Sequence, residues 1–442
     1  MRSITRTLGL TLCLHLILAG RVGADPVTDW NANAGKAAIA SCISPANDPL
    51  HESRLYAMMH IAIHDALNAI DRRSRPYAFD VRVERPTSGD AAVAAAARDV
   101  LVPAIMQLPF PPECVQAGID SVEADYAAAL AAVPPGAEKA RGIELGQAAA
   151  AAIHAVRGFD GSDTPLVDPA YPQGTSPGEY RFTPGFDFAF APGWGNVTPF
   201  ALRRSSQFRA DPPFDVRGRK YAADFNEVKR LGGDGVTTPS ARTSEQTEIG
   251  LFWLESSPLA WNRIARSVSA SRGLDRWENA RLFGLLNIAM ADGYIGSWEG
   301  KYFYNFWRPV TAIQTADTDG NPATRADPTW TPLQPTYPMP DHDSAHSVEG
   351  GAAAEVLKQF FGTDDIRFRA CSLTLPDGSK CSDPSPVIRR YASFSQAADE
   401  NAMSRILVGI HFRRAVEEGV EHGRRIGRRA VNRFMKPVHA GH

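Results

Sequence analysis

The chain has 442 residues, of which 44% are hydrophobic and 22% are charged, a composition typical of a globular protein with a sizeable core. Its formal net charge of −2 excludes a general attraction to nucleic acid or to anionic lipid. A chain of this length is expected to hold about two to three domains.

The first 24 residues predict an export signal. Arg2 and Arg6 lie at the start, the apolar run LGLTLCLHLILAG follows, and the small residues VGA come shortly before Asp25. We expect a signal peptide over residues 1–24, cleaved after Ala24. The apolar run is short for a membrane span, and no later segment has the required length. The mature protein is therefore expected to be exported, periplasmic or extracellular, and to have no membrane span.

The cysteines support an oxidising compartment. Five become four when Cys13 leaves with the signal, and an even number in an exported protein predicts disulfides. Cys371 and Cys381 flank the turn-forming segment SLTLPDGSK, which predicts a local bridge between them. Cys42 and Cys114 remain, either as a second bridge or as buried free thiols.

Helical patterns dominate the first part of the mature chain. Apolar residues recur at helical spacing from Asn31 to about Ile70, in a segment that contains RLYAMMHIAIHDALNAI. Three further alanine-rich helices are expected over DAAVAAAARDVLVPAIMQL, over about Pro112 to Val133, and over GAEKARGIELGQAAAAAIHAVRG. His60 and His64 lie four residues apart and could share a metal ion. We expect partnered core histidines instead.

A change of character divides the chain. From Phe159 to about Arg217 the sequence is dense in Pro, Gly and aromatic residues, which predicts a long ordered excursion packed on the helices. Helical spacing then resumes, and ENARLFGLLNIAMADGYIGSW predicts a central helix. We expect an N-terminal helical region over 25–158, the excursion over 159–217, and a helical domain with the functional site over 218–442. The predicted class is all-α, a helical bundle with long loops.

The first candidate cluster is WEGKYFYNFWRP. Lys301 and Arg308 are seven residues apart, so two helical turns would place them about 10 Å apart on one face. Pro309 disfavours helical conformation at Arg308. The neighbouring aromatic residues are Trp298, Tyr302, Phe303, Tyr304, Phe306 and Trp307. Cations in such surroundings indicate cation–π packing or a buried anion, although a Lys and an Arg near a helix end are usually solvated.

The second cluster is MPDHDSAHSVEGG. A helix is expected from about His346 or Ser347, and its unpaired N–H groups and dipole suit an oxyanion. Ser344 would add a hydroxyl group, or would serve only as an N-cap. His346 would then act on whatever the anion binds. The alternative is a divalent-metal site formed by the DHD run at 341–343 together with His346, although no known metal motif is present.

The third cluster is SRILVGIHFRRA. Arg405 and His411 are expected in one apolar helix that starts near Ser395, about 9 Å apart along the axis and about 120° apart around it. Gly409 permits close approach of another group. An arginine in such apolar company indicates a buried partner, whereas His411 alone would more often be a core histidine. Together the three clusters supply the donors and the acid/base that one tetrahedral or bipyramidal oxyanion requires.

These clusters resemble the three signature motifs of the vanadium-dependent haloperoxidase and type-2 phosphatidic-acid phosphatase superfamily. The matching residues are Lys301 followed by Arg308-Pro309, then Ser344-Ala345-His346, then Ser404-Arg405 followed by His411. The likeness covers about Leu251 to Gly427 and is similar to the exported bacterial haloperoxidase-like branch. It implies a helical bundle. It also implies a vanadate or phosphate held by Lys301, Arg308 and Arg405, with hydrogen bonds from Ser344 and from the backbone N–H of Ala345.

The resemblance also implies catalytic roles. His411 would bind vanadium at the apical position, or would attack phosphorus in a phosphatase. His346 would be the general acid/base, and Lys301 would polarise the bound peroxide. Trp298, three residues before the lysine, resembles a haloperoxidase pocket residue.

This sequence departs from the family pattern at three positions. Ala345 stands where the family usually has Gly, and Ala415 stands where an Asp often follows the histidine of the third motif. His411 therefore needs another group to orient it. Met339 occupies a position that often carries an aromatic residue or His in characterised haloperoxidases.

The leading hypothesis is a vanadate-dependent haloperoxidase that uses hydrogen peroxide to oxidise halide, which then reacts with a small organic substrate. The alternative is an exported acid phosphatase in which His411 forms a phosphohistidine and His346 protonates the leaving group. The missing carboxylate at Ala415 favours the first, because a nucleophilic histidine benefits most from a carboxylate partner. A third class is a non-catalytic protein that retains the fold.

Overall fold

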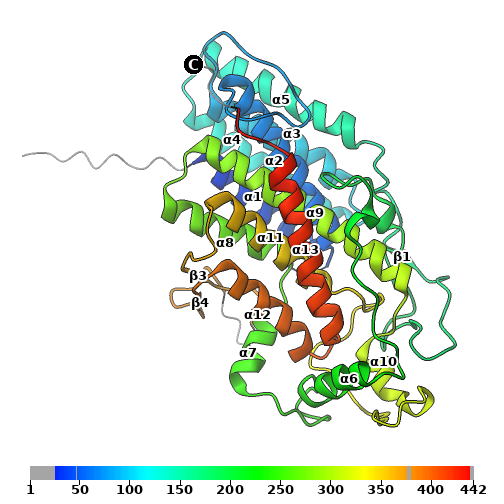
Figure 1. The fold of residues 1–442 in the computed structure, drawn as a ribbon. Helices are drawn as coiled ribbons and strands as arrows, with labels where there is room; N and C mark the ends of the chain where they lie inside the picture. The colour runs from blue at the N-terminus through cyan, green and yellow to red at the C-terminus, as the bar shows by residue number, and fades with distance from the viewer. Residues whose placement is uncertain (1–24, 46, 376–379, 439–442) are drawn as a thin grey trace, which may run out of the picture.

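Thirteen α-helices build the described part of the chain in the computed structural model, which covers residues 25–45, 47–375 and 380–438 (Figure 1). The predicted all-α class is confirmed, because the strands among these residues form only two short antiparallel pairs. The predicted signal peptide and its cleavage point after Ala24 lie outside the described residues. Within the described ranges, no helix is long and apolar enough to cross a membrane.

The elements follow one another in a simple order. The N-terminal helices are α1 (Pro26–Ala40), α2 (Pro49–Ile70), α3 (Gly89–Met106), α4 (Pro112–Ala132) and α5 (Ala137–Arg157). The later helices are α6 (Arg219–Leu231), α7 (Ser244–Phe252), α8 (Ser257–Arg272), α9 (Arg276–Tyr304), α10 (Pro309–Gln314), α11 (Ala345–Phe361), α12 (Phe394–Leu407) and α13 (Arg413–Arg433). Strand β1 (Val167–Asp168) pairs with β2 (Ala189–Phe190), and β3 (Phe368–Ala370) pairs with β4 (Arg389–Tyr391). Three 3-10 helices are η1 (Trp194–Asn196), η2 (Ser205–Phe208) and η3 (Ala316–Thr318).

Both expected cysteine pairs are present as disulfides. Cys42–Cys114 ties the turn between α1 and α2 to the first turn of α4, and its Cα atoms lie 5.6 Å apart. Cys371–Cys381 closes a short loop beside β3, with Cα atoms 5.2 Å apart. Free thiols at Cys42 and Cys114 are therefore excluded. The first bridge spans 72 residues and restricts the unfolded chain more than the second, which spans 10.

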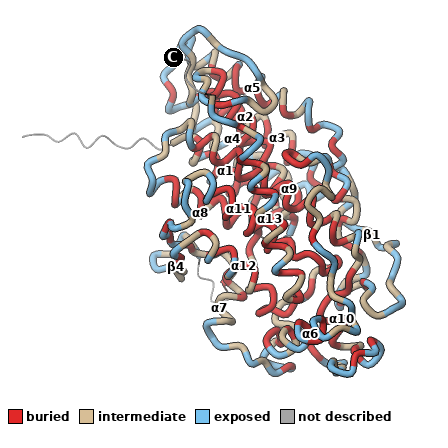
Figure 2. Tube along the Cα trace, viewed as in Figure 1, coloured by how far each residue is buried: buried red, intermediate tan, exposed pale blue. Residues whose placement is uncertain are grey.

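Helix α9 is the central element, as its sequence predicts. Asp275 caps its N-terminus in a reciprocal capping box with Glu278, and most of its residues are buried on all sides. It packs against α2 of the N-terminal region and against α11 and α13 of the C-terminal region. Figure 2 shows buried residues concentrated along these helices. One hydrophobic core therefore joins the first and last parts of the chain.

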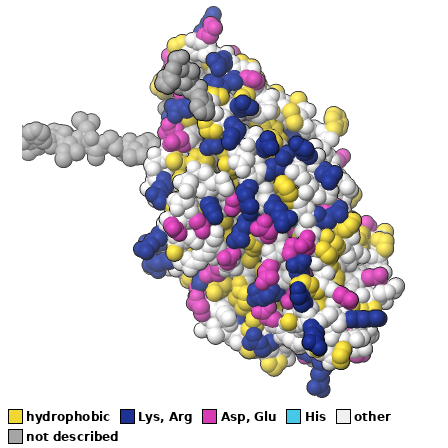
Figure 3. All heavy atoms as spheres, viewed as in Figure 1, with side chains coloured by type: hydrophobic (Ala, Val, Ile, Leu, Met, Phe, Trp, Pro, Cys, Tyr) yellow, Lys and Arg dark blue, Asp and Glu magenta, His cyan; other side chains and the backbone are white. Residues whose placement is uncertain are grey.

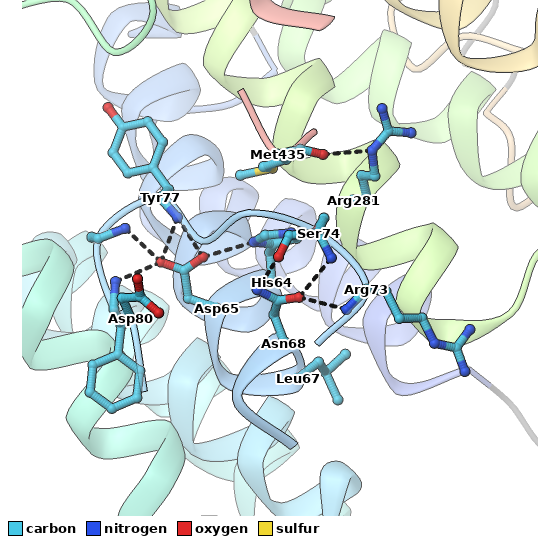
Figure 4. A network of polar contacts seen from close by, with 12 residues as sticks. His64, Asp65, Leu67, Asn68, Arg73, Ser74, Tyr77, Asp80, Arg281 and Met435 are labelled. Atoms are coloured by element: carbon cyan, nitrogen blue, oxygen red, sulfur yellow. Dashed lines mark hydrogen bonds and ion pairs between the residues drawn. The ribbon is translucent and has the colours of Figure 1, made fainter. Parts of the chain in front are cut away.

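The two histidines of α2 are core residues with separate partners, as expected. His64 Nδ1 lies 2.8 Å from Asp65 Oδ1, and its Nε2 lies 2.7 Å from Ser74 Oγ. His60 Nε2 lies 2.8 Å from Asn31 Nδ2. Figure 4 shows that Asp65 also accepts hydrogen bonds from backbone N–H groups of the segment after α2. The His64 network therefore fixes that segment against the helix and leaves no ligand pair for a metal ion.

The aromatic-rich excursion over 159–217 is ordered and lies along α9. The buried Asp292 of α9 accepts hydrogen bonds from the three consecutive backbone N–H groups of residues 200–202, at 2.6 to 2.7 Å. Arg209 pairs with Glu299, one turn before the end of the same helix. Because these contacts are buried or partly buried, the excursion is part of the packed structure. On the molecular face in Figure 3, side chains of both charge signs are interspersed.

Candidate active site

One cavity of about 720 Å³ brings the three sequence clusters together. The predicted site residues in its lining are Trp298, Lys301, Arg308, Ala345, His346, Arg405 and His411. Ser344 precedes Ala345 and is completely buried, but it is not part of the lining. The side chains come from α9, the N-terminus of α11, α12 and two loops, so the convergence that the sequence required is observed.

The chain turns between Lys301 and Arg308. Helix α9 ends at Tyr304, and Asn305 takes a left-handed conformation with φ 48° and ψ 43°. Arg308 is extended, with φ −85° and ψ 157°, as expected for a residue before proline. The predicted helical spacing of seven residues is therefore wrong. The two cations nevertheless line one cavity.

Lys301 holds the loop before α11. Its Nζ donates hydrogen bonds to the backbone carbonyl oxygens of Pro340 and Asp341, each at 3.1 Å, and of Asp343 at 2.5 Å. The side chain is completely buried. Burial, reinforced by the nearby Arg308, lowers the pKa of Lys301 to about 7. An anion in the cavity would favour the charged ammonium.

Arg308 joins two loops of the site. Its Nε donates to the carbonyl oxygen of Met339 at 2.7 Å, and its Nη1 donates to that of Ile410 at 2.8 Å. The same Nη1 lies 3.0 Å from Nε2 of His411. The guanidinium group is therefore fixed in place, and it brings the loop before α11 next to the loop after α12.

Arg405 has the buried surroundings that its apolar sequence context predicts. Its Nε donates to Ser404 Oγ at 2.9 Å, and its Nη2 donates to the carbonyl oxygen of Trp253 at 2.6 Å. Its Nη1 is buried and has no partner among the described residues. Burial lowers the pKa of Arg405 to about 10. A buried donor without a partner is costly, so this atom points to a missing acceptor.

His411 lies in a loop, and the predicted helix through it is wrong. Helix α12 ends at Leu407, and Gly409 turns the chain with φ 84° before α13 begins at Arg413. His411 is 5% exposed and lines the cavity. The helical geometry expected between Arg405 and His411 therefore does not apply.

Asp341 orients His411, a role that the sequence analysis missed. Its Oδ1 lies 2.8 Å from His411 Nδ1. Arg308 Nη1 can only donate and lies 3.0 Å from Nε2, so Nε2 carries the lone pair and Nδ1 carries the hydrogen that faces Asp341. Burial raises the pKa of Asp341 to about 7, and its ionised form accepts this hydrogen. Burial and the neighbouring cations lower the pKa of His411 well below its usual value, which favours this neutral form. The only available signal was the position of Asp341 inside the second cluster.

Replacing Gly409 with alanine should destabilise the protein. A Cβ atom here would lie 2.5 Å from the carbonyl oxygen of Gly232, and the left-handed backbone costs about 1–2 kcal/mol for an L-residue. Urea unfolding should show that the free energy of unfolding falls by at least that amount. Gly300→Ala is the matched control, because an added Cβ there meets nothing within 4 Å and alanine favours the helix by about 1 kcal/mol. Equal stability of the two variants would contradict the role of Gly409.

The N-terminus of α11 carries His346 into the cavity. The helix begins at Ala345, close to the predicted start. Ser344 occupies the N-cap position, but its side chain accepts no capping hydrogen bond and instead accepts one from Ser347 Oγ at 3.0 Å. The first N–H groups of the helix have no intrahelical acceptor, and Ala345, the first residue of the helix, lines the cavity.

His346 is held in one tautomer. Its Nε2 lies 3.2 Å from the carbonyl oxygen of Glu255, which only accepts, so Nε2 carries the hydrogen and Nδ1 is free to take a proton. Burial and the charge of Arg405 lower the pKa of His346 well below its usual value. The side chain is therefore neutral at neutral pH, the form a general base requires.

The alternative metal site in the second cluster is wrong. Asp341 pairs with His411, and Asp343 pairs with His422 at 2.7 Å. His342 lies 2.7 Å from the carbonyl oxygen of Asp211, away from His346. The four side chains thus have four different partners. No group of three or more potential metal-ligating side chains occurs within the described ranges.

A buried carboxyl group lies close to the cavity. Glu52 of α2 is completely buried, and neither of its oxygen atoms has a good hydrogen-bond partner among the described residues. Burial raises its pKa to about 7, although the nearby Ser256, which lines the cavity, opposes this shift. The protonated form is therefore favoured up to neutral pH.

Glu52→Gln should stabilise the protein at high pH only. The carboxyl group ionises near pH 4.5 in the unfolded chain but near 7 in the fold, so the wild type loses stability as the pH rises between these values. The loss reaches about 3 kcal/mol above pH 7, at about 1.4 kcal/mol per pH unit. Urea unfolding should show a larger free energy of unfolding for the variant than for the wild type at pH 8, and no difference at pH 4. A gain of equal size at both pH values would contradict this account.

The cavity has the properties of an oxyanion site. Lys301, Arg308 and Arg405 are all buried, and none forms a salt bridge with a carboxylate among the described residues. Buried charges need a counter-charge, and three cations around one cavity fit a multiply charged oxyanion. The Nη1 of Arg405, which has no partner among the described residues, and the first N–H groups of α11 add hydrogen-bond donors for such an ion. The lone pair of His411 Nε2 could bind its central atom.

Comparisons with known proteins identify the relatives of this arrangement. The family described as the VCPO second helical-bundle domain matches residues 281–440, which hold all the predicted site residues. The vanadium chloroperoxidase of Curvularia inaequalis is 26% identical over 282 residues, an alignment that covers 50% of this chain. The alignment covers only 45% of the fungal enzyme, less than half of its length.

Solved structures share the fold over most of the chain. A bacterial vanadium-dependent iodoperoxidase superposes with a TM-score of 0.75 at 24% identity, covering 94% of this chain and 98% of the other. An apo-type bacterial vanadium-dependent chloroperoxidase superposes with a TM-score of 0.68 at 15% identity, covering 88% and 94%. At these identities, the likeness establishes the helical fold.

Proposed function

Since residues 281–440 match the VCPO second helical-bundle domain, we propose that the chain is a vanadate-dependent haloperoxidase. One observation carries the proposal: three buried cations without carboxylate partners surround a cavity that two neutral histidines also line. The substrates are hydrogen peroxide, a halide and a small organic molecule.

The residues present fit vanadate as the cofactor. Lys301, Arg308 and Arg405 would neutralise its oxygen atoms, and the unpartnered Nη1 of Arg405 supplies a donor that the protein itself does not use. The N–H of Ala345 and the hydroxyl of Ser344 would add hydrogen bonds. When bound, vanadate supplies a Lewis acid that activates peroxide without a change in its own oxidation state.

The two histidines have different tasks. His411 would offer the Nε2 lone pair to vanadium in place of its present contact with Arg308 Nη1, because Nδ1 carries the hydrogen that faces Asp341. His346 would take a proton from hydrogen peroxide at Nδ1, because the carbonyl of Glu255 holds the hydrogen on Nε2. Lys301 would supply positive charge next to the oxygen atoms of the bound anion. The ring centroid of Trp298 lies 6.0 Å from Lys301 Nζ, a distance at which a cation–π contact would favour the charged ammonium.

An acid phosphatase is the second candidate, and the Asp341–His411 pair favours it. The absence of a carboxylate at Ala415 counted against a nucleophilic histidine, but Asp341 supplies that carboxylate from another loop. In this case His411 would attack phosphorus and His346 would protonate the leaving group. The same cations would bind phosphate.

Titration with orthovanadate separates the two candidates. A haloperoxidase should gain peroxide-dependent bromination of an organic dye as vanadate saturates the site, and should hydrolyse p-nitrophenyl phosphate slowly or not at all. A phosphatase should hydrolyse p-nitrophenyl phosphate and lose that activity on addition of vanadate. No gain in bromination at saturating vanadate would contradict the proposed function.

We further propose that the chain is exported, with a signal peptide over residues 1–24 cleaved after Ala24. The two disulfides support an oxidising compartment. We also retain the division into an N-terminal helical region at 25–158, an excursion at 159–217 and a site-bearing domain at 218–442. Mass spectrometry of the secreted or periplasmic protein should find an N-terminus at Asp25.

A further inference from the structure

The cavity is divided into a cationic end and apolar walls. The lining within the described ranges contains three cations and two histidines but no Asp or Glu. Its Phe, Tyr and Trp members are Phe110, Phe186, Phe188, Phe190, Tyr294, Trp298 and Tyr337. A volume of about 720 Å³ falls within the ~300–1,000 Å³ typical of small-molecule sites, far more than a halide and peroxide require.

Much of the apolar wall lies outside the matched family domain. Phe110 belongs to the loop between α3 and α4, and Phe186, Phe188 and Phe190 belong to the excursion, whereas the domain match begins at residue 281. The cationic end therefore carries the shared chemistry of the family. The wall comes largely from segments outside the matched domain and can select what reaches that end.

The wall is rigid where it meets the site. The backbone N–H of Phe190 donates to the carbonyl oxygen of Pro338 at 2.6 Å, and the carbonyl oxygen of Phe190 accepts from Tyr302 Oη at 2.5 Å. Trp298 Nε1 donates to the same oxygen at 3.3 Å, and the rings of Phe190 and Trp298 pack edge to face. The wall thus keeps a fixed position relative to Lys301, one turn further along α9.

Phe186 and Phe188 form the more open part of the wall. Both are half-buried, and their rings lie 5.6 Å apart at 89°. Such an arrangement offers ring faces and edges to a planar guest, and aromatic pairs of this kind are favourable beyond the area that they bury. A saturated or strongly polar guest would not use these contacts as well.

We propose that the aromatic wall binds a neutral, electron-rich aromatic compound of the phenol class and holds it for halogenation at the cationic end. The proposal rests on the proposed haloperoxidase function. With no carboxylate in the lining and three cations present, a positively charged guest is repelled. The overall reaction is ArH + X⁻ + H₂O₂ + H⁺ → ArX + 2 H₂O. Peroxide is reduced, halide is oxidised by two electrons, and the displaced ring hydrogen leaves as a proton.

Direct binding tests the wall without any turnover. We expect the full-length wild type to bind 2-naphthol saturably in isothermal titration calorimetry, and to bind a naphthol that carries a quaternary ammonium group at least about tenfold more weakly. Phe188→Ala should raise the Kd for 2-naphthol by about tenfold. Phe159→Ala is the matched control, because Phe159 belongs to the same excursion, is fully exposed and does not line the cavity. Equal binding of the neutral and cationic probes would overturn the proposal.

Turnover separates this proposal from the proposed function. Phe188→Ala should leave vanadate-dependent iodide oxidation, measured without an organic acceptor, within twofold of wild type, while it raises the KM for 2-naphthol. In a mixture of both naphthols, the wild type should brominate the neutral one more selectively than reagent hypobromite does. Iodide oxidation with the product ratio of the free reagent would overturn the wall proposal alone. Saturable naphthol binding without any iodide oxidation would overturn the proposed function instead.

Discussion

Replacing His411 with alanine should abolish vanadate binding and vanadate-dependent bromide oxidation. The variant loses the one side-chain lone pair that Asp341 holds toward the cationic end of the cavity. Loss of a group that only orients a metal-binding side chain typically lowers metal affinity by about 10–100-fold. Loss of the metal-binding side chain itself should therefore lower vanadate affinity by more than about a hundredfold. Calorimetric titration of the variant with orthovanadate measures this change directly.

Two other histidines provide the comparison. His346→Ala should bind vanadate nearly as well as wild type but should oxidise bromide about 10²–10⁴-fold more slowly, because only the proton acceptor is lost. His342→Ala should change neither value greatly, since His342 contacts Asp211 and does not line the cavity. Equal loss of vanadate affinity in the His411 and His346 variants would contradict the separate roles assigned to them.

The sequence predicted the helical fold well because helix formation depends mainly on local spacing. The apolar run of α9 indicated a buried central helix, and the alanine-rich segments indicated α3, α4 and α5. The pattern from Asn31 to Ile70 contains the two helices α1 and α2 in place of one unbroken segment. The intervening turn includes Cys42 with φ 65° and the bridge to Cys114. That turn depends on a partner far along the chain, which local spacing does not reveal.

The sequence indicated the residue types of the site more reliably than their local geometry. Lys301 and Arg308 share the cavity although Asn305 ends the helix between them, and His411 lies beyond the end of α12. The prediction that these residues meet at one site was correct, but helical spacing does not explain it. Lys301 and Arg308 are held there by buried hydrogen bonds to the carbonyl oxygens of Met339, Pro340 and Ile410. Backbone carbonyls leave no trace in the sequence.

The carboxylate that orients His411 is likewise not evident from the local sequence. Asp341 and His411 are 70 residues apart, whereas the family pattern places a carboxylate four residues after the histidine. Asp341 had been noticed only as a possible metal ligand, because its neighbours in the chain are also potential ligands. Its real partner became evident only when the loop before α11 was placed against the loop after α12.

Asp341→Asn should lower vanadate affinity and bromide turnover by about 10–100-fold while the cavity keeps its shape. Asparagine has nearly the same size, but its side-chain oxygen is uncharged and its amide NH₂ can only donate. The variant therefore orients His411 less strongly and permits the tautomer with hydrogen on Nε2, which has no lone pair for vanadium. Calorimetry with orthovanadate and a bromination assay at saturating vanadate would measure the two effects separately.

Asp65→Asn is a close structural control for that experiment. Asp65 and His64 form a buried pair with the same 2.8 Å separation as Asp341 and His411. Unlike His411, His64 does not line the cavity, and Asp65 does not line it either. Both Asn variants replace a buried carboxyl group that pairs with a histidine, and both should lose stability in urea unfolding. Only Asp341→Asn should weaken vanadate binding, because only its histidine reaches the anion. If Asp65→Asn weakened vanadate binding equally, the effect would be a general loss of stability, and Asp341 would have no orienting role.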